Sequence, residues 1–128
     1  MNAGEIMRRL ARAAQTGNSD AYWSLHAADF VAHIPGKSRV GGDHRGHGAL
    51  QALDDLENDL TEGSIEHEVH DTLVSRDHAV LLMRLLARRP GRGALDARVV
   101  YVYHVRDEKL AELWVHPLDQ VRFDEFWL

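Results

Sequence analysis

The 128-residue chain is 45% hydrophobic and 27% charged, as is typical of a soluble protein with one core, and its formal net charge of −5 argues against a nucleic-acid partner. It contains no cysteine, which excludes disulfides, thiolate metal sites and cysteine nucleophiles. Because no apolar run reaches the ~18–20 residues that span a bilayer, and the charged N-terminal segment is unlike a signal peptide, we expect one cytoplasmic domain over residues 1–128 with no membrane partner.

Two helices are predicted at the start of the chain. Asn2 followed by Glu5 resembles a capping box, in which the two side chains satisfy free backbone N–H groups. Apolar residues then follow helical spacing until Gly17 offers a stop. Ser19 can cap a second, short helix that ends near Leu25.

A short strand and a longer helix are predicted next. The run DFVAHI, residues 29–34, suits a strand that ends at the turn residues Pro35 and Gly36. A glycine-rich loop then leads into a helix over residues 48–60, which Gly63 ends. Four leucines of this helix fall on one face: Leu50, Leu53, Leu56 and Leu60.

The second half of the chain changes to patterns typical of β-strands. Four strands are predicted over residues 65–74, 78–89, 95–105 and 109–116. Asp119 can cap a last short helix over residues 120–127. This order predicts an α+β fold with helices on one face of a curved antiparallel sheet. The second and third of these strands are apolar on both faces, so we expect a homodimer in which a partner subunit covers the other sheet face.

The segment HIPGKS, residues 33–38, ends like a phosphate-binding loop. A Walker A loop needs G-x-x-x-x-G-K-[ST], because its glycines let backbone N–H groups wrap the phosphates. With Gly36 as the second glycine, the first would fall at Val31, inside an apolar run. A nucleotide-binding function is therefore rejected.

Three motifs resemble the NTF2-like superfamily and its SnoaL-like group: FVAHIPG at 30–36, GGDHRGHG at 41–48 and KLAELWVHPLD at 109–119. The resemblance runs over essentially the whole chain. It implies an NTF2-like cone, in which a curved antiparallel or mixed sheet packs on N-terminal helices around one apolar pocket. Relatives include ketosteroid isomerases, limonene-epoxide hydrolases, polyketide cyclases and proteins without catalysis, so the fold alone does not give the function.

The resemblance also implies roles for single positions. His33 falls where ketosteroid isomerases carry their general-base aspartate and epoxide hydrolases a water-binding asparagine. Arg84 matches the arginine of the hydrolase Asp-Arg-Asp triad and His116 its second aspartate, whereas Leu86 stands in place of the first. Because those carboxylates are missing, neither mechanism can be copied intact.

Two further positions correspond to the isomerase oxyanion hole, Tyr101 to its aspartic acid and Leu10 to its tyrosine. We therefore expect four catalytic residues: His33 as base, His116 as its acid partner, and Arg84 and Tyr101 as stabilisers of negative charge. The expected substrate-binding residues are Leu10, Trp23, Val31, Leu86, Val99, Tyr103 and Trp114.

Structural alternatives stay open for these residues. His33 can be a structural histidine bonded to a backbone carbonyl, and Arg84 can pair with an acidic residue of a neighbouring strand, such as Glu66 or Glu68. His116 and Trp114 share one face of their strand. That face lines the pocket if it is concave and a dimer interface if it is convex.

We expect no metal and no cofactor, because no histidine spacing matches a metal site; HEVH at 67–70 is not H-E-x-x-H. Two functional hypotheses follow. The first is a cofactor-independent isomerase, cyclase or hydrolase that acts by acid–base chemistry on a small apolar carbonyl, polyketide, steroid-like or epoxide substrate. The second is a non-catalytic module that binds a small molecule or a protein in the same pocket.

Overall fold

The computed structural model describes residues 1–128 and contains four helices and one six-stranded sheet. The helices are α1 (Ala3–Thr16), α2 (Ser19–Ser24), α3 (Gly46–Thr61) and α4 (Gln120–Trp127). The strands are β1 (His26–Ile34), β2 (Gly42–Arg45), β3 (Glu66–Val74), β4 (His78–Arg89), β5 (Gly93–Arg106) and β6 (Lys109–Pro117). The α+β class expected from the sequence is confirmed.

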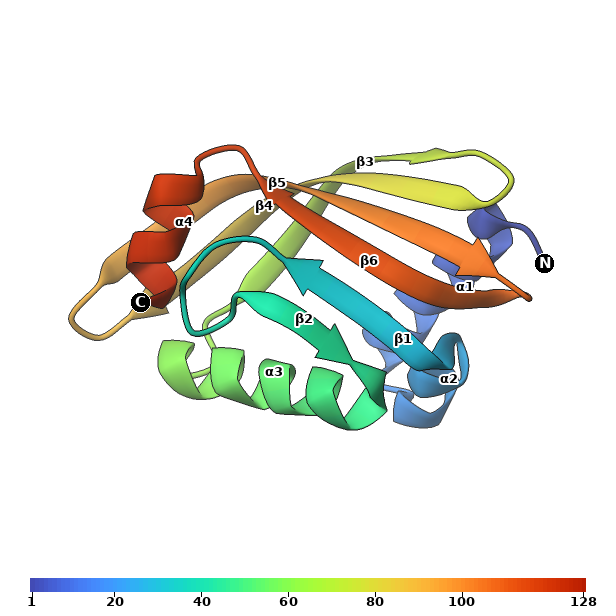
Figure 1. Cartoon of the computed structure of the whole chain (residues 1–128), viewed down its shortest axis with the longest axis horizontal. Coiled ribbons are helices and arrows are strands. Elements are labelled where there is room, and N and C mark those ends of the chain that lie inside the picture. Colours follow the sequence, from blue (N-terminus) through green and yellow to red (C-terminus); the bar gives the residue numbers. More distant parts are fainter.

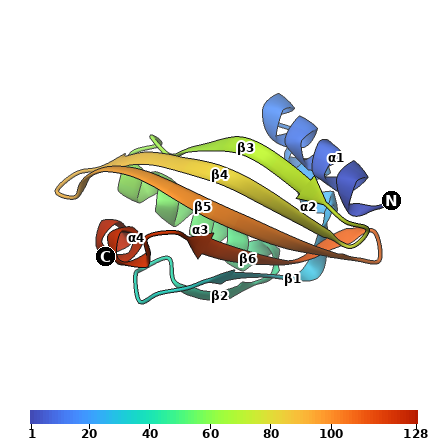
Figure 2. The same ribbon diagram turned by 90° about the horizontal axis from the view of Figure 1, so that it is seen from above.

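The sheet is mixed and open. Its strands follow the order β2-β1-β6-β5-β4-β3, with β1 parallel to β6 and the other neighbours antiparallel. Figure 1 shows the sheet bending over α3, with α1 and α2 at one end and α4 at the other. Figure 2 shows α3 behind the strands, between the two edges of the sheet. The helices therefore cover only one, concave face. None of them combines the length and apolarity needed to cross a membrane.

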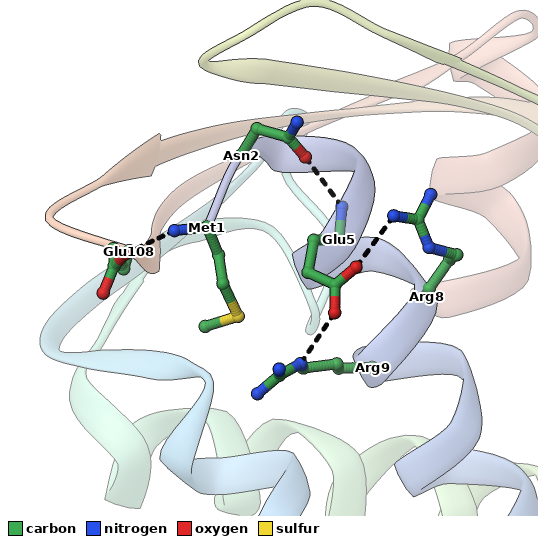
Figure 3. Close-up of polar contacts among 6 residues, drawn as sticks. All are labelled: Met1, Asn2, Glu5, Arg8, Arg9 and Glu108. Atoms are coloured by element: carbon green, nitrogen blue, oxygen red, sulfur yellow. Dashed lines mark hydrogen bonds and ion pairs between the residues drawn. The ribbon is translucent and has the colours of Figure 1, made fainter.

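The start of α1 shows how local sequence fixes an element. The Asn2 side chain accepts a hydrogen bond from the Glu5 backbone N–H at 3.0 Å, as a helix cap does. The Glu5 carboxylate, however, pairs with Arg8 and Arg9 rather than completing the capping box (Figure 3). The N-terminal ammonium of Met1 pairs with Glu108, which ties the helix start to the β5–β6 turn (Figure 3).

The predicted elements match the observed ones with two corrections. Asn18, and not Ser19, caps α2, because its side chain accepts a hydrogen bond from Ala21 N–H. The predicted glycine-rich loop contains β2, an edge strand of four residues that pairs with β1. Its glycines and charged residues hid this strand from a search for apolar alternation. The cap at Asp119 is confirmed.

The core lies between the helices and the concave face. On β4 and β5 most residues that face it are buried, with Ala97 and Tyr101 half-buried, whereas alternate residues on the outer face are half-buried or exposed. The four leucines of α3 face the same core, Leu53 buried and Leu50, Leu56 and Leu60 packed against it. This division of the sheet into an inner and an outer face decides which residues reach the cavity.

Candidate active site

A cavity of about 500 Å³ lies within the core, between the concave face and α1 to α3. Of its 27 lining residues 21 are hydrophobic, so it suits a small, largely apolar molecule. The other six are Gln15, His26, Asp54, Glu57, His67 and Thr72. No lysine or arginine is among them.

A second hollow of about 470 Å³ adjoins this cavity under α2 and α3. The two spaces share five lining residues: Ala14, Tyr22, Asp54, Glu57 and His67. The two carboxylates therefore stand where the hollow meets the apolar cavity.

Helix α3 carries both carboxylates toward the cavity. Leu50, Leu53, Asp54 and Glu57 follow the spacing i, i+3, i+4, i+7, which places them on one helical face. Burial, and then the charge of Asp54, raise the pKa of Glu57 to about 8. Burial also raises the pKa of Asp54. Glu57 consequently holds a proton over much of the neutral pH range, which an ordinary glutamate does not.

Three tyrosines line the same cavity: Tyr22 from α2, and Tyr101 and Tyr103 from β5. Burial raises the pKa of Tyr22 to about 12 and that of Tyr101 still further. The charge of Glu57 adds to the upward pKa shift of both Tyr22 and Tyr101, so these groups are close enough to interact. Tyr103 is buried as well, and this burial raises its pKa. The three hydroxyls thus keep their protons and can donate hydrogen bonds.

Two histidines complete the polar lining. Burial lowers the pKa of His26 and of His67, which favours their neutral forms. His67 lies edge-on to Tyr101, with ring centroids 6.2 Å apart. The cavity therefore brings together carboxyl, phenol and neutral imidazole groups in apolar surroundings, where proton transfer to and from a bound molecule is possible.

Five of the residues predicted from the sequence lie at these spaces. Leu10, Val99, Tyr101 and Tyr103 line the cavity, and Trp23 lines the adjoining hollow. The sequence search missed Asp54, Glu57 and His26. The positions of the two carboxylates on the apolar face of a predicted helix could have indicated them. No sequence pattern indicated His26.

The inward orientation expected for His33 is wrong. Ala32 and Ile34 line the cavity from β1, so His33 between them points to the outer face. There its Nδ1 lies 2.8 Å from Asp43 and its Nε2 lies 2.8 Å from Glu112. These contacts, Glu112 first, raise the pKa of His33.

The remaining predicted residues also lie off the cavity. Arg84 is on the outer face, where it pairs with Asp96 in two hydrogen bonds of 2.8 and 2.6 Å and lies 3.8 Å from Glu68. An ion pair with Glu68 was the structural alternative for this residue. Four others belong to strand positions that alternate with cavity-lining ones: Val31, Leu86, Trp114 and His116. Their expected place in the pocket is corrected. The alternation of side chains along a strand shows which residues share a face, but it does not show whether that face is the concave or the outer one.

No group of three or more histidine, aspartate or glutamate residues is placed to hold a metal ion.

The sequence matches the SnoaL-like domain family over residues 7–113. The chain belongs to this family. Among solved structures, it is similar to Bal32a from a soil-derived mobile gene cassette, with 28% identity, a TM-score of 0.87 and coverage of 98% of this chain and 95% of that one. An NTF2-like protein from Burkholderia xenovorans gives 19% identity, a TM-score of 0.78 and coverage of 97% and 94%.

A third similar structure is RV0760c from Mycobacterium tuberculosis in complex with estradiol-17beta-hemisuccinate. It has 20% identity, a TM-score of 0.70, and coverage of 90% of this chain and 93% of that one. No curated protein matches the sequence. The NTF2-like α+β cone implied by the sequence motifs is therefore confirmed, with its sheet open rather than closed.

Proposed function

We propose that this SnoaL-like protein is a cofactor-independent enzyme that transfers a proton within a small, largely apolar carbonyl compound, such as a polyketide or steroid-like ketone. One observation carries the proposal: Glu57, whose pKa is raised to about 8, borders an apolar cavity that Tyr101 also lines. A general acid or base works best when its pKa lies near the working pH.

The roles of these residues follow from their chemistry. The ionised carboxylate of Glu57 takes a proton from the carbon next to the substrate carbonyl, and the electron pair moves onto the carbonyl oxygen. Tyr101 donates a hydrogen bond to that oxygen and stabilises its charge. Glu57 then returns the proton to another carbon, which completes an isomerisation. In a cyclisation the enolate carbon instead attacks a second carbonyl of the same molecule, and the alkoxide that forms takes the proton from Glu57.

The comparisons support the size and class of the ligand. The protein from Mycobacterium tuberculosis binds a steroid ester, and its fold is similar to that of this chain. The cavity here, at about 500 Å³ with mostly apolar walls, is of the size that holds such a molecule.

The test starts from a ligand screen. Steroids, terpene epoxides and polyketide-like ketones are screened for thermal stabilisation of the protein, and deuterium incorporation next to the carbonyl of a bound ketone is followed by NMR in D₂O. Glu57→Gln should slow this exchange by roughly 10²–10⁴-fold with ligand binding retained. Asp59→Asn, an exposed change on the same helix, should leave it unchanged. Undiminished exchange in Glu57→Gln would remove its assigned role.

A binding module is the second candidate. It is favoured by the place of His33, Arg84 and His116, because three of the four residues expected to carry catalysis lie outside the cavity. Tight binding of ketones without any exchange above the rate in buffer would decide for it.

We also propose a homodimer formed through the outer face of the sheet. The centre of this face is apolar and half-exposed, with Val80, Leu82, Val100, Val102 and Trp114. Arg98 lies toward one end of it and Glu112 toward the other. A two-fold axis through the apolar centre sets the basic end of each subunit against the acidic end of its partner.

A further inference from the structure

His26, at the start of β1, is held in one orientation against the cavity. Its Nδ1 lies 2.9 Å from the backbone carbonyl oxygen of Tyr22. Its ring packs on the Tyr22 ring and against the edge of Phe30, with centroids 4.7 and 4.9 Å away. The side chain thus has no freedom to turn its Nε2 elsewhere.

This hydrogen bond fixes the tautomer of the ring. A carbonyl oxygen only accepts, so the hydrogen must sit on Nδ1 of His26. Burial keeps the pKa of His26 below its usual range, so the ring is neutral. In a neutral imidazole with its hydrogen on Nδ1, Nε2 carries a lone pair and acts as an acceptor.

No protein donor reaches this acceptor. His26 is only 4% exposed, and the open space that it borders is the cavity. Buried polar atoms are nearly always hydrogen-bonded, so an acceptor left free on a cavity wall marks a position for a donor from outside the protein.

A second free group lies on the same lining. Tyr103 is 7% exposed, lines the cavity, and its hydroxyl has no partner within the protein. The lining has no lysine or arginine to receive an anion, while an ionised Asp54 repels one. A neutral group that can donate a hydrogen bond, such as a hydroxyl, fits these surroundings better than a carboxylate or phosphate.

We propose that His26 is a ligand-binding residue, whose Nε2 accepts a hydrogen bond from a hydroxyl group on a neutral, largely apolar ligand. The proposal rests on the cavity being the ligand site, as the proposed function requires. It adds a requirement on the ligand, which must carry an alcohol or phenol in addition to its apolar body.

The test compares two probes with the same ring system, 2-naphthol and its methyl ether 2-methoxynaphthalene, by titration into wild-type protein labelled with ¹⁵N in its histidines. We expect 2-naphthol to bind about tenfold more tightly, the worth of one hydrogen bond, and to shift the His26 Nε2 resonance. The methyl ether should leave that resonance in place. The free protein should show hydrogen on Nδ1 and none on Nε2.

The outcomes separate this inference from the proposed function. Equal affinities with no change at His26 Nε2, or hydrogen on Nε2 in the free protein, would overturn the inference and leave the cavity as a ligand site. Failure of both probes to shift any cavity resonance would overturn both. In His26→Phe the preference for 2-naphthol should disappear, whereas His116→Phe, a change on the outer face, should keep it. The wild-type spectra decide the question even where His26→Phe does not fold.

Discussion

Two histidines, His26 and His33, have surroundings that favour different charges on their rings. His26 is buried next to apolar groups and is neutral, whereas His33 lies between two carboxylates. Because carboxylates accept hydrogen bonds, the pair favours the protonated form of His33, in which both ring nitrogens donate. In that form His33 ties strands together and has no lone pair for base chemistry, while the neutral His26 keeps one.

Glycine at position 36 is required by the backbone rather than by a phosphate. Gly36 has φ +99°, a value that residues with a side chain rarely adopt, and a methyl group there would overlap the Asp124 carboxylate of α4. Gly36→Ala should therefore destabilise the protein by about 1–3 kcal/mol in urea denaturation. Lys37→Ala, at an exposed neighbouring position, is the control and should have no effect. Equal stability of both variants would show that this turn is not constrained.

At the scale of elements, the sequence identified every helix and the long strands, because the spacing of apolar residues differs clearly between helices and strands. It did not show which residues of β1 point into the cavity. Phe30, Val31 and Ala32 are all buried, so this strand has no alternation from which to choose a face. Val31 and His33 share a face, but it is the outer one. The irregular pairing of β1 with β6 between His26 and Val31 is a further feature that no local pattern reveals.

Helix α3 shows the converse case. Its apolar face was predicted correctly, and the two carboxylates on that face could have been found from their spacing alone. What the spacing could not show is that Glu57 lines one cavity with tyrosines from α2 and β5, which lie far apart in the sequence. A site assembled across three elements needs the tertiary structure.

The three strands β2, β1 and β6 are joined on the outer face by His33 with Asp43 and Glu112. The folded-state pKa of His33 is raised, so its contribution to stability is complete below about pH 6.5, the unfolded value, and is lost as the pH rises through the folded pKa. His33→Gln should cost about 1 kcal/mol at pH 5.5 and less at pH 9, as measured by urea denaturation.

The control for this change is His116→Gln, which alters an exposed residue of the same face. It should cost little at either pH. A cost of His33→Gln that is equal at the two pH values would show that the ring acts by packing on Trp114 and not by its charge.

At the scale of the whole molecule, the two faces of the sheet have different roles. The concave face encloses the cavity, and the outer face presents an apolar centre to solvent. We predict that the protein sediments as a dimer at micromolar concentration. Leu82→Glu should give monomers by placing a charge at that centre, and Val121→Glu, on the exposed side of α4, should not. A wild-type monomer at tens of micromolar would refute the dimer.

The proposed function depends most on the carboxyl of Glu57, whose raised pKa marks it as the group that takes a proton from the substrate and returns it. A ¹³C NMR titration of its side-chain carboxyl measures this without any knowledge of the substrate. The midpoint should lie near 8, because burial and Asp54 disfavour the charged form. A midpoint near 4.5, the ordinary value for glutamate, would contradict the raised pKa on which the assignment of Glu57 as the proton-transfer group rests.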